Sequence, residues 1–274
     1  MLLLPFVPLL DDRPRPTTPY ELSWALHPSV IIGTGLLGAL YFWGIGPLRR
    51  RRELGPPAAP WQIASFSSAL VVLLFALNGP MHDLSDYYLF SVHMVQHLVL
   101  TLVFPPLLIA GTPGWLLNPI LRHQPIRRVA RVLTYPVVAA GVYIVTIAAW
   151  HVAPAYDLMM RDHEVHIAMH IMFMMAATIM WWPVMSPSPE LPRLSPGLGM
   201  LYLFLVGIPM QLVAALITLA NRVLYPWYSA APRMWGLSPL DDQRLGGLLM
   251  WVPGNLWMFL AIGVVFLRWA RESK

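Results

Sequence analysis

The sequence predicts an all-α membrane protein in which seven transmembrane helices cross the bilayer, with the N-terminus outside and the C-terminus in the cytoplasm. Three observations lead to this prediction. The 274 residues are 57% hydrophobic and only 11% charged, whereas a soluble domain has about 25% charged residues. Seven apolar stretches have the length and composition expected of spans. Arginines gather in the loops on one side of these stretches.

A spanning helix needs roughly 20 mostly apolar residues. The expected spans are residues 30–47, 63–78, 88–109, 132–150, 163–184, 198–221 and 246–269. The second span is short, and Trp61 is expected to anchor one of its ends. Pro105, Pro106, Pro209 and Pro253 lie within the spans. They predict kinks, which membrane helices tolerate.

The segment 1–28 is expected to lie at the outer face of the membrane. Its opening, MLLLPFVPLL, is too short to span the bilayer and lacks the basic stretch of a signal peptide. The chain shows no internal repeat and no linker. A single domain over residues 1–274 is therefore expected.

Arginine sets the expected orientation. With the loop RRRRE at residues 49–53 in the cytoplasm, twelve of the eighteen Lys and Arg residues fall on the cytoplasmic side. Ten of the thirteen Asp and Glu residues then fall on the outer side. The positive-inside rule favours this arrangement. The basic residues are thus explained as topology signals, and no nucleic-acid partner is expected.

This topology sorts the nine histidines unevenly, since only His123 falls on the cytoplasmic side. In the third span, His93 and His97 are four residues apart, and such residues share one face of a helix. The outer histidines are His27, His82, His93, His97, His151, His163, His166 and His170.

In the fifth span, the motif HEVHIAMH places His163, His166 and His170 along one stripe. Ionisable groups inside a membrane rarely face lipid. The two histidine stripes lie at similar depth from the same side, so we expect them to converge on one metal ion. His27, His82 and His123 are expected to be hydrogen-bonded packing residues. The predicted metal ligands are His93, His97, His166 and His170, with His151 and His163 at span ends to close or gate the site.

The absence of cysteine excludes disulfides, thiolate metal sites and a Cys nucleophile. Imidazole suits copper, zinc, iron or nickel, and thioether sulfur favours Cu(I). The methionines near the stripes are Met94, Met169, Met172 and Met174. Copper is therefore the leading candidate, zinc the second and haem iron the third. HEVH is not a zinc-protease motif, because position 167, where that motif needs its second His, is Ile.

Carboxylates precede two of the spans. Asp83 and Asp86 lie before the third span, and Asp241 and Asp242 lie before the seventh. They are expected either to cap helices or to orient metal-bound histidines from outside the ligand shell. Gly246 and Gly247 follow Asp242 and predict close helix packing.

Aromatic residues gather at the ends of the spans and predict an interfacial belt. They are Trp61, Trp115, Trp150, Trp181, Trp182, Tyr225, Trp227, Tyr228, Trp235 and Trp257.

Four segments resemble the CtaG family of multi-span cytochrome c oxidase assembly factors, which is associated with caa-type oxidases. They occur in the expected order over about two-thirds of the chain. The resemblance is not to the single-span, cysteine-dependent copper chaperone that sometimes shares the CtaG name. The four segments are HDLSDYYLFSVHMVQHLVLTLVFPPLLIAGTP at 82–113, WHVAPAYD at 150–157, HIAMHIMFMMAATIMWWPVM at 166–185 and LSPLDDQRLGGLLMWVPG at 237–254.

The resemblance implies a multi-pass protein of the bacterial plasma membrane that helps to mature the oxidase, with copper delivery or copper-site assembly as its task. It implies oxidase subunits as partners. A copper donor protein on the outer side is a further expected partner, and no catalysed reaction is expected. The acidic–Gln pair of the family maps to Asp242 and Gln243, which would support the site. The family histidines map to His93, His97, His151, His166 and His170.

Three other functions remain open from the residues. An intramembrane zinc hydrolase would use Asp83, Asp86 or Glu164 as general base toward a zinc-activated water. A haem-binding redox protein would use His97 and His170 as axial ligands. A scaffold without metal would pair its histidines with Asp83, Asp86 or Asp242.

Overall fold

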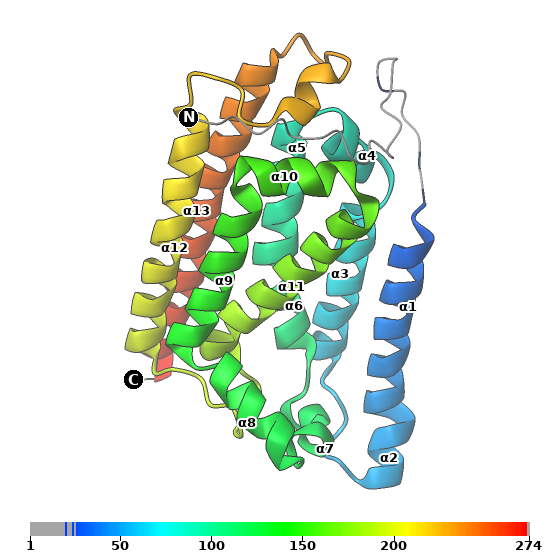
Figure 1. Ribbon diagram of the computed structural model, residues 1–274. Coiled ribbons are helices and arrows are strands. Elements are labelled where there is room, and N and C mark those ends of the chain that lie inside the picture. The colour runs from blue at the N-terminus through cyan, green and yellow to red at the C-terminus, as the bar shows by residue number, and fades with distance from the viewer. Residues whose placement is uncertain (1–19, 21–23, 25, 273–274) are drawn as a thin grey trace.

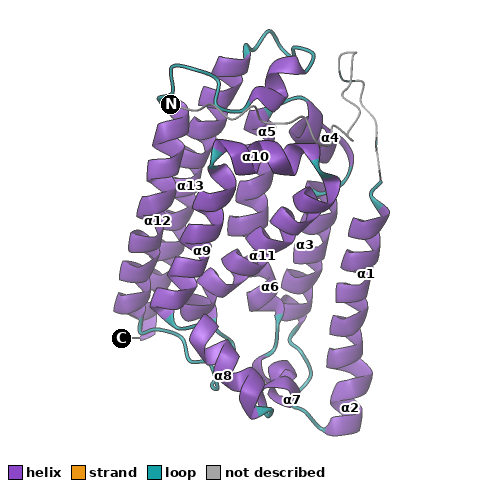
Figure 2. Cartoon of the chain, in the orientation of Figure 1, coloured by secondary structure: helices purple, strands orange, loops and turns teal. Residues whose placement is uncertain are grey.

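The computed structural model describes residues 20, 24 and 26–272, and every regular element within them is a helix (Figure 2). This confirms the all-α prediction. Most of the segment 1–28, expected at the outer face, lies outside the described residues.

Within the described ranges, five helical segments are long and apolar enough to cross a membrane. Two bent helix pairs raise the number of candidate spans to seven if each pair is counted as one span. The first pair is α3 (Pro60–Ala76) with α4 (Gly79–Tyr87), bent by 47°. The second is α8 (Gln124–Leu133) with α9 (Pro136–His151), bent by 68°. The chain is thus a helical protein with five to seven candidate spans.

The five unpaired candidate spans include three continuous helices and two composite segments. The segment Pro28–Arg52 joins α1 (Pro28–Trp43), η1 (Gly44–Leu48) and α2 (Arg49–Arg52), and the segment Phe90–Gly111 joins α5 (Phe90–Leu98), η2 (Val99–Val103) and α6 (Phe104–Gly111). The continuous helices are α11 (His163–Met185), α12 (Pro196–Thr218) and α13 (Pro239–Glu272). The remaining short helices are η3 (Gly114–Leu117), α7 (Asn118–Leu121), α10 (Ala153–Arg161) and η4 (Pro226–Ala230).

Proline begins several of these helices, and Pro136 moves the start of one predicted span. The span expected at 132–150 was wrong at its start, since α8 ends at Leu133 and α9 begins at Pro136. Tyr135 between them is extended, with φ −65° and ψ 129°. The residue before a proline is disfavoured in the helical region, because the ring crowds its backbone. The break between the helices therefore follows from Pro136.

The third span changes its winding directly after the histidine pair. Residues Val99–Val103 form one π-helical turn between α5 and α6. Pro105 and Pro106 begin α6 and cannot donate backbone hydrogen bonds to the preceding turn. Such π turns lengthen the local repeat and often occur at functional sites. By contrast, α12 with Pro209 and α13 with Pro253 are each assigned as one continuous helix.

Helices α12 and α13 pack along each other, and glycine allows their close approach. A Cβ atom at Gly247 would lie 2.7 Å from the backbone nitrogen of Thr218, closer than real side chains come. A Cβ atom at Gly246 would clash with the ring of Phe90. The predicted close packing at these two glycines is confirmed. Helix α13 begins at Pro239, seven residues before its predicted start.

The two ends of the bundle differ in character. Helices α4 and α10 and the loop with η4 cover one end, and α2, α7 and α8 lie at the other end with the last turns of α13 (Figure 1). The arginines of α2 and α8 therefore lie at the end opposite α4 and α10. Between the ends, the largest core cluster is built from fully buried side chains such as Met169, Phe173 and Leu203.

Candidate metal centre

Three histidines from two spans meet inside the bundle near the end covered by α4 and α10. His93 and His97 project from α5, and His170 projects from α11. Each offers one ring nitrogen such that all three nitrogens lie within 4.8 Å of one another. The three residues are 0–5% exposed. The two histidine stripes that the sequence placed on separate spans are thus brought together.

Four ring nitrogens of this triad have no protein partner and are therefore free to bind a metal. The Nε2 atom of His93, both ring nitrogens of His97 and Nε2 of His170 are buried without a hydrogen bond. The Nδ1 atom of His93 lies 3.3 Å from the carbonyl oxygen of Ser85. A carbonyl only accepts hydrogen bonds, so this contact places the proton on Nδ1 and leaves the Nε2 lone pair free.

His151 reaches the same region from α9. It is buried, and its ring centroid lies 6.0 Å from that of His97. Its Nδ1 donates to the carbonyl oxygen of Ile147 at 2.8 Å, whereas Nε2 is buried without a partner. A metal-binding histidine typically donates its other ring N–H in this way. His151 is therefore oriented as a fourth ligand would be.

A second histidine layer lies beside the triad and is paired with a carboxylate. Asp86 on α4 is buried, and its Oδ1 lies 3.4 Å from Nε2 of His166 and 3.6 Å from Nδ1 of His82. The Nδ1 atom of His82 also lies 3.1 Å from the side-chain amide nitrogen of Gln96. His82 is therefore a hydrogen-bonded packing residue, as expected. The ring of His166 stacks edge-on to His170 at 4.5 Å, which places it between Asp86 and the triad.

The other acidic candidates and His163 lie farther toward the surface. His163 and Glu164 are exposed at the start of α11, where Asp162 caps the helix through the amides of Glu164 and Val165. Asp83 on α4 is half-buried. The structure therefore does not bring His163 into the triad.

Asp242 and Gln243 accept hydrogen bonds from backbone amides of neighbouring segments. The carboxylate of Asp242, on α13, accepts from the amide nitrogen of Phe90 at 2.7 Å and from that of Ser91 at 3.1 Å. It therefore caps the first turn of α5, the helix that carries His93. Gln243 accepts from the amide of Leu224 and holds the loop that follows α12. Both residues position the elements around the histidines.

Two tyrosines that were not predicted as site residues lie between the histidines and the end of the bundle covered by α10 and η4. The Tyr228 hydroxyl donates to the carbonyl oxygen of Ser85 at 2.6 Å and lies 3.1 Å from Nδ1 of His93. The hydroxyl of Tyr156, on α10, lies 3.1 Å from that of Tyr228. Burial raises the pKa of Tyr156, so this hydroxyl stays protonated. The contacts fix the ring of His93 from the side opposite to Nε2.

The aromatic belt was wrong for four of its predicted members. Trp181, Tyr225, Trp227 and Tyr228 are 2–3% exposed and lie in the core. The three residues of the loop near η4 fold inward and hydrogen-bond to backbone groups around the histidines, because this loop covers the end of the bundle. The clustering of these three residues within YPWY, next to a span end, could have suggested a cap on the site as well as a belt.

The methionines separate into two groups. Met94 and Met169 are fully buried, and Met172 is 44% exposed. Met174 lines a cavity between α1 and α11. In the described part of the chain, the His, Asp or Glu side chains with metal-ligand spacing are the three imidazoles of the triad.

Comparison with known proteins identifies relatives in mycobacteria. The chain is 25% identical over 280 residues to an uncharacterized protein of Mycobacterium bovis and to one of Mycobacterium tuberculosis, covering 94% of this chain and 41% of each relative. It is 25% identical over 255 residues to an uncharacterized protein of Mycobacterium leprae, covering 87% of this chain and 38% of that relative. The chain thus spans about two-fifths of the length of these relatives. No solved structure matches.

A family comparison covers most of the chain, from residue 39 to residue 272. The match includes α5, α9, α11 and α13, and with them the histidine triad, His151 and the Asp242 cap. The chain therefore belongs to the family of cytochrome c oxidase caa3 assembly factors, also called Caa3_CtaG.

Proposed function

We propose that this assembly factor holds a copper ion as cargo at His93, His97 and His170, with His151 as fourth ligand, and passes it to an oxidase subunit. His166 would lie beside these ligands and connect them to Asp86. His163 is left out of this set because it lies exposed at the start of α11.

One observation carries the proposal, namely the convergence of buried imidazole nitrogens that have no partner. A buried polar atom without a hydrogen bond costs about 1–3 kcal/mol. His93, His97, His151 and His170 each hold at least one such nitrogen. A bound ion would satisfy these atoms together, so the donor set fits a metal. The metal-free scaffold fits less well, because Asp86 contacts His166 and His82 and Asp242 is engaged by backbone amides.

Two observations favour copper over other metals, namely the types of ligand available and the family to which the chain belongs. Imidazole suits copper and zinc alike, and the chain offers no thiolate that would close the site. The family serves a cytochrome c oxidase, for which copper is the cargo that fits. Release to a partner needs exchangeable ligands, and neutral imidazoles meet that need better than thiolates.

We further propose that the protein crosses the bacterial plasma membrane seven times, with each bent pair acting as one span. The excess of arginine at the end with α2 and α8 supports a cytoplasmic location for that end. The histidines then lie near the outer face. Copper would arrive there from an outer donor protein and leave for an oxidase subunit docked alongside.

The test is elemental analysis of the protein purified in mild detergent and loaded with Cu(I) or Zn(II). We expect one ion per chain in the parent protein and loss of that ion in the double variant His97→Ala, His170→Ala. His123→Ala is the matched control, because His123 is exposed at the opposite end. Unchanged metal content in a double variant with native helix content would overturn the proposal. A Soret band in the absorption spectrum would instead support the haem alternative.

An intramembrane zinc hydrolase is a second candidate, and one observation favours it. A cavity of about 560 Å³ reaches His166 and His170, and Asp86 lies beside His166 as a carboxylate that could serve as base. Zinc in the preparation would establish this function if the protein also turns over a lipid amide and the variant Asp86→Asn loses that turnover. Absence of turnover with zinc bound would exclude it.

A further inference from the structure

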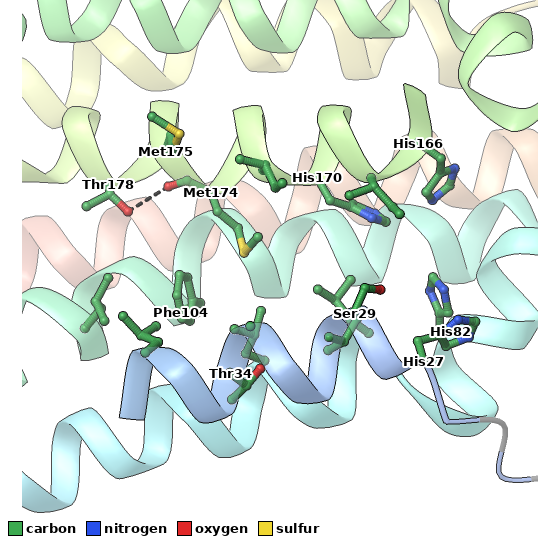
Figure 3. A pocket seen from close by; sticks show the side chains of 18 of the residues that line it. His27, Ser29, Thr34, His82, Phe104, His166, His170, Met174, Met175 and Thr178 are labelled. Carbon is green, nitrogen blue, oxygen red and sulfur yellow. Dashed lines mark hydrogen bonds between the residues drawn. The ribbon is translucent and has the colours of Figure 1, made fainter. Parts of the chain in front are cut away.

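A long apolar cavity lies beside α1, which otherwise packs on α3. It has a volume of about 560 Å³ and runs between α1 and α11, with α3 and α6 as its floor (Figure 3). Its walls are the side chains of residues such as Val30, Leu37, Phe104, Met174 and Ile179. The lining residues on α11 run from His163 to Ile179, which is roughly 24 Å of helix.

One end of this cavity is polar. His27, His82, His166 and His170 gather there, whereas Phe104, Met174 and Thr178 lie toward the other end (Figure 3). His166 and His170 are 1% and 5% exposed, and each has ring nitrogen without a hydrogen bond. The cavity is therefore amphipathic along its length, with imidazoles at the end nearer α4.

The cavity opens sideways, where a bilayer would surround the helices. Ile171 and Met175, which line it, are also strongly exposed on α11. Gly33 of α1 lines it as well, and a Cβ atom at this glycine would meet nothing within 4 Å. Both walls belong to segments that can cross a membrane. Away from the histidines the walls are apolar, so an apolar occupant is favoured there over water.

We propose that this cavity, a groove open along its side, binds one acyl chain of a bilayer lipid, with the ester carbonyl at the polar end beside His166. The apolar walls bury the chain, and an imidazole N–H donates to the carbonyl oxygen. One lipid chain spans one leaflet, about 15 Å of the roughly 30 Å hydrocarbon core. The groove along α11 is long enough for it.

The size of the groove argues against a helix from a partner protein. An α-helix is about 10–12 Å across and rises 5.4 Å per turn, so one turn occupies roughly 400–600 Å³. The whole cavity holds about one such turn, whereas a spanning helix has five or more. A single extended chain is the occupant whose shape fits.

The experiment uses photolabelling in vesicles of phosphatidylethanolamine and phosphatidylglycerol. The probe is a phosphatidylglycerol with a diazirine midway along one acyl chain, and labelled peptides are mapped by mass spectrometry. We expect label on groove residues such as Met174. Gly33→Phe fills the groove and should lower this label several-fold, whereas Gly35→Phe should leave it unchanged. Gly35 is a matched control, since it lies on α1 with nothing within 4 Å but does not line the cavity.

Two outcomes would overturn the proposal. One is equal labelling of Gly33→Phe and Gly35→Phe with native helix content in both. The other is label on the exposed face of α12, at Leu212 and Leu216, as strong as in the groove. If Gly33→Phe fails to fold, the smaller Gly33→Leu against Gly35→Leu makes the same comparison. His97→Ala should keep the label, because His97 does not line the cavity, and this separates the groove from the metal proposal.

Discussion

The rings of His97 on α5 and His170 on α11 lie with their centroids 5.8 Å apart and their planes at 85°. Both rings are buried, and both have ring nitrogen without a protein partner. Placing two such rings together inside a membrane protein is unfavourable unless something binds them. His93, the third member of the triad, is held in place by Tyr228 and Ser85.

Replacing Tyr228 by Phe should weaken metal binding by about tenfold or more, as loss of a group that orients a ligand commonly does. The variant removes the hydroxyl that donates to Ser85 and contacts Nδ1 of His93. Isothermal titration with Cu(I) or Zn(II) in detergent measures the change. Tyr135→Phe is the control, because Tyr135 is exposed at the far end. Equal affinity in both variants would show that Tyr228 does not orient the ligand.

Replacing Asp242 by Asn should lower both thermal stability and metal affinity. The carboxylate accepts two backbone N–H groups at the start of α5, and the amide nitrogen of Asn would face one of these donors. An unsatisfied buried donor costs about 1–3 kcal/mol. Melting curves with and without metal measure the effect. Asp241→Asn should change little, since Asp241 is exposed and bonds only to Ser238.

His151 and His163 should differ sharply in their effect on metal binding, although both were expected to close or gate the site. His151 lies beside His97 with a buried free nitrogen, whereas His163 is exposed. We expect His151→Ala to weaken metal binding and His163→Ala to leave it near the parent value. Competition with a chromophoric chelator gives both affinities. The reverse order would place the fourth ligand at the entrance of α11.

Two glycines of α13 provide a test of the fold itself. Gly247→Ala should destabilise the protein by about 1–3 kcal/mol, because its Cβ atom would meet the backbone of Thr218. Gly263→Ala should be neutral or slightly stabilising, since nothing lies within 4 Å and alanine favours helix. Melting temperatures of the two variants make the comparison. Similar temperatures would mean that α12 and α13 are not held this close.

Helix periodicity accounts for what the sequence predicted well. The spacing of His93 and His97, and of His166 and His170, fixes which residues share a face, and span composition fixes their depth. These two facts suffice to expect convergence of α5 and α11. The triad itself, with His166 beside it rather than within it, depends on how the helices rotate against each other, which spacing does not give.

Long-range contacts account for what the sequence did not predict. Asp242 was expected near a helix start, but it caps α5 from a position 152 residues away. Tyr228 reaches His93 only because the loop after α12 folds over the bundle. The bend between α3 and α4 brings Asp86, on α4, to His166 on α11. Each of these contacts requires the tertiary arrangement, and local pattern alone does not specify it.

The most direct test of the account is X-ray absorption at the copper edge of the copper-loaded protein. Three or four buried imidazoles holding one ion predict a first shell of nitrogen alone, with the outer scattering typical of imidazole rings. That scattering should disappear in the variant His97→Ala, His170→Ala. A sulfur atom in the first shell would move the site to the methionines, and copper that binds without imidazole scattering would contradict the account.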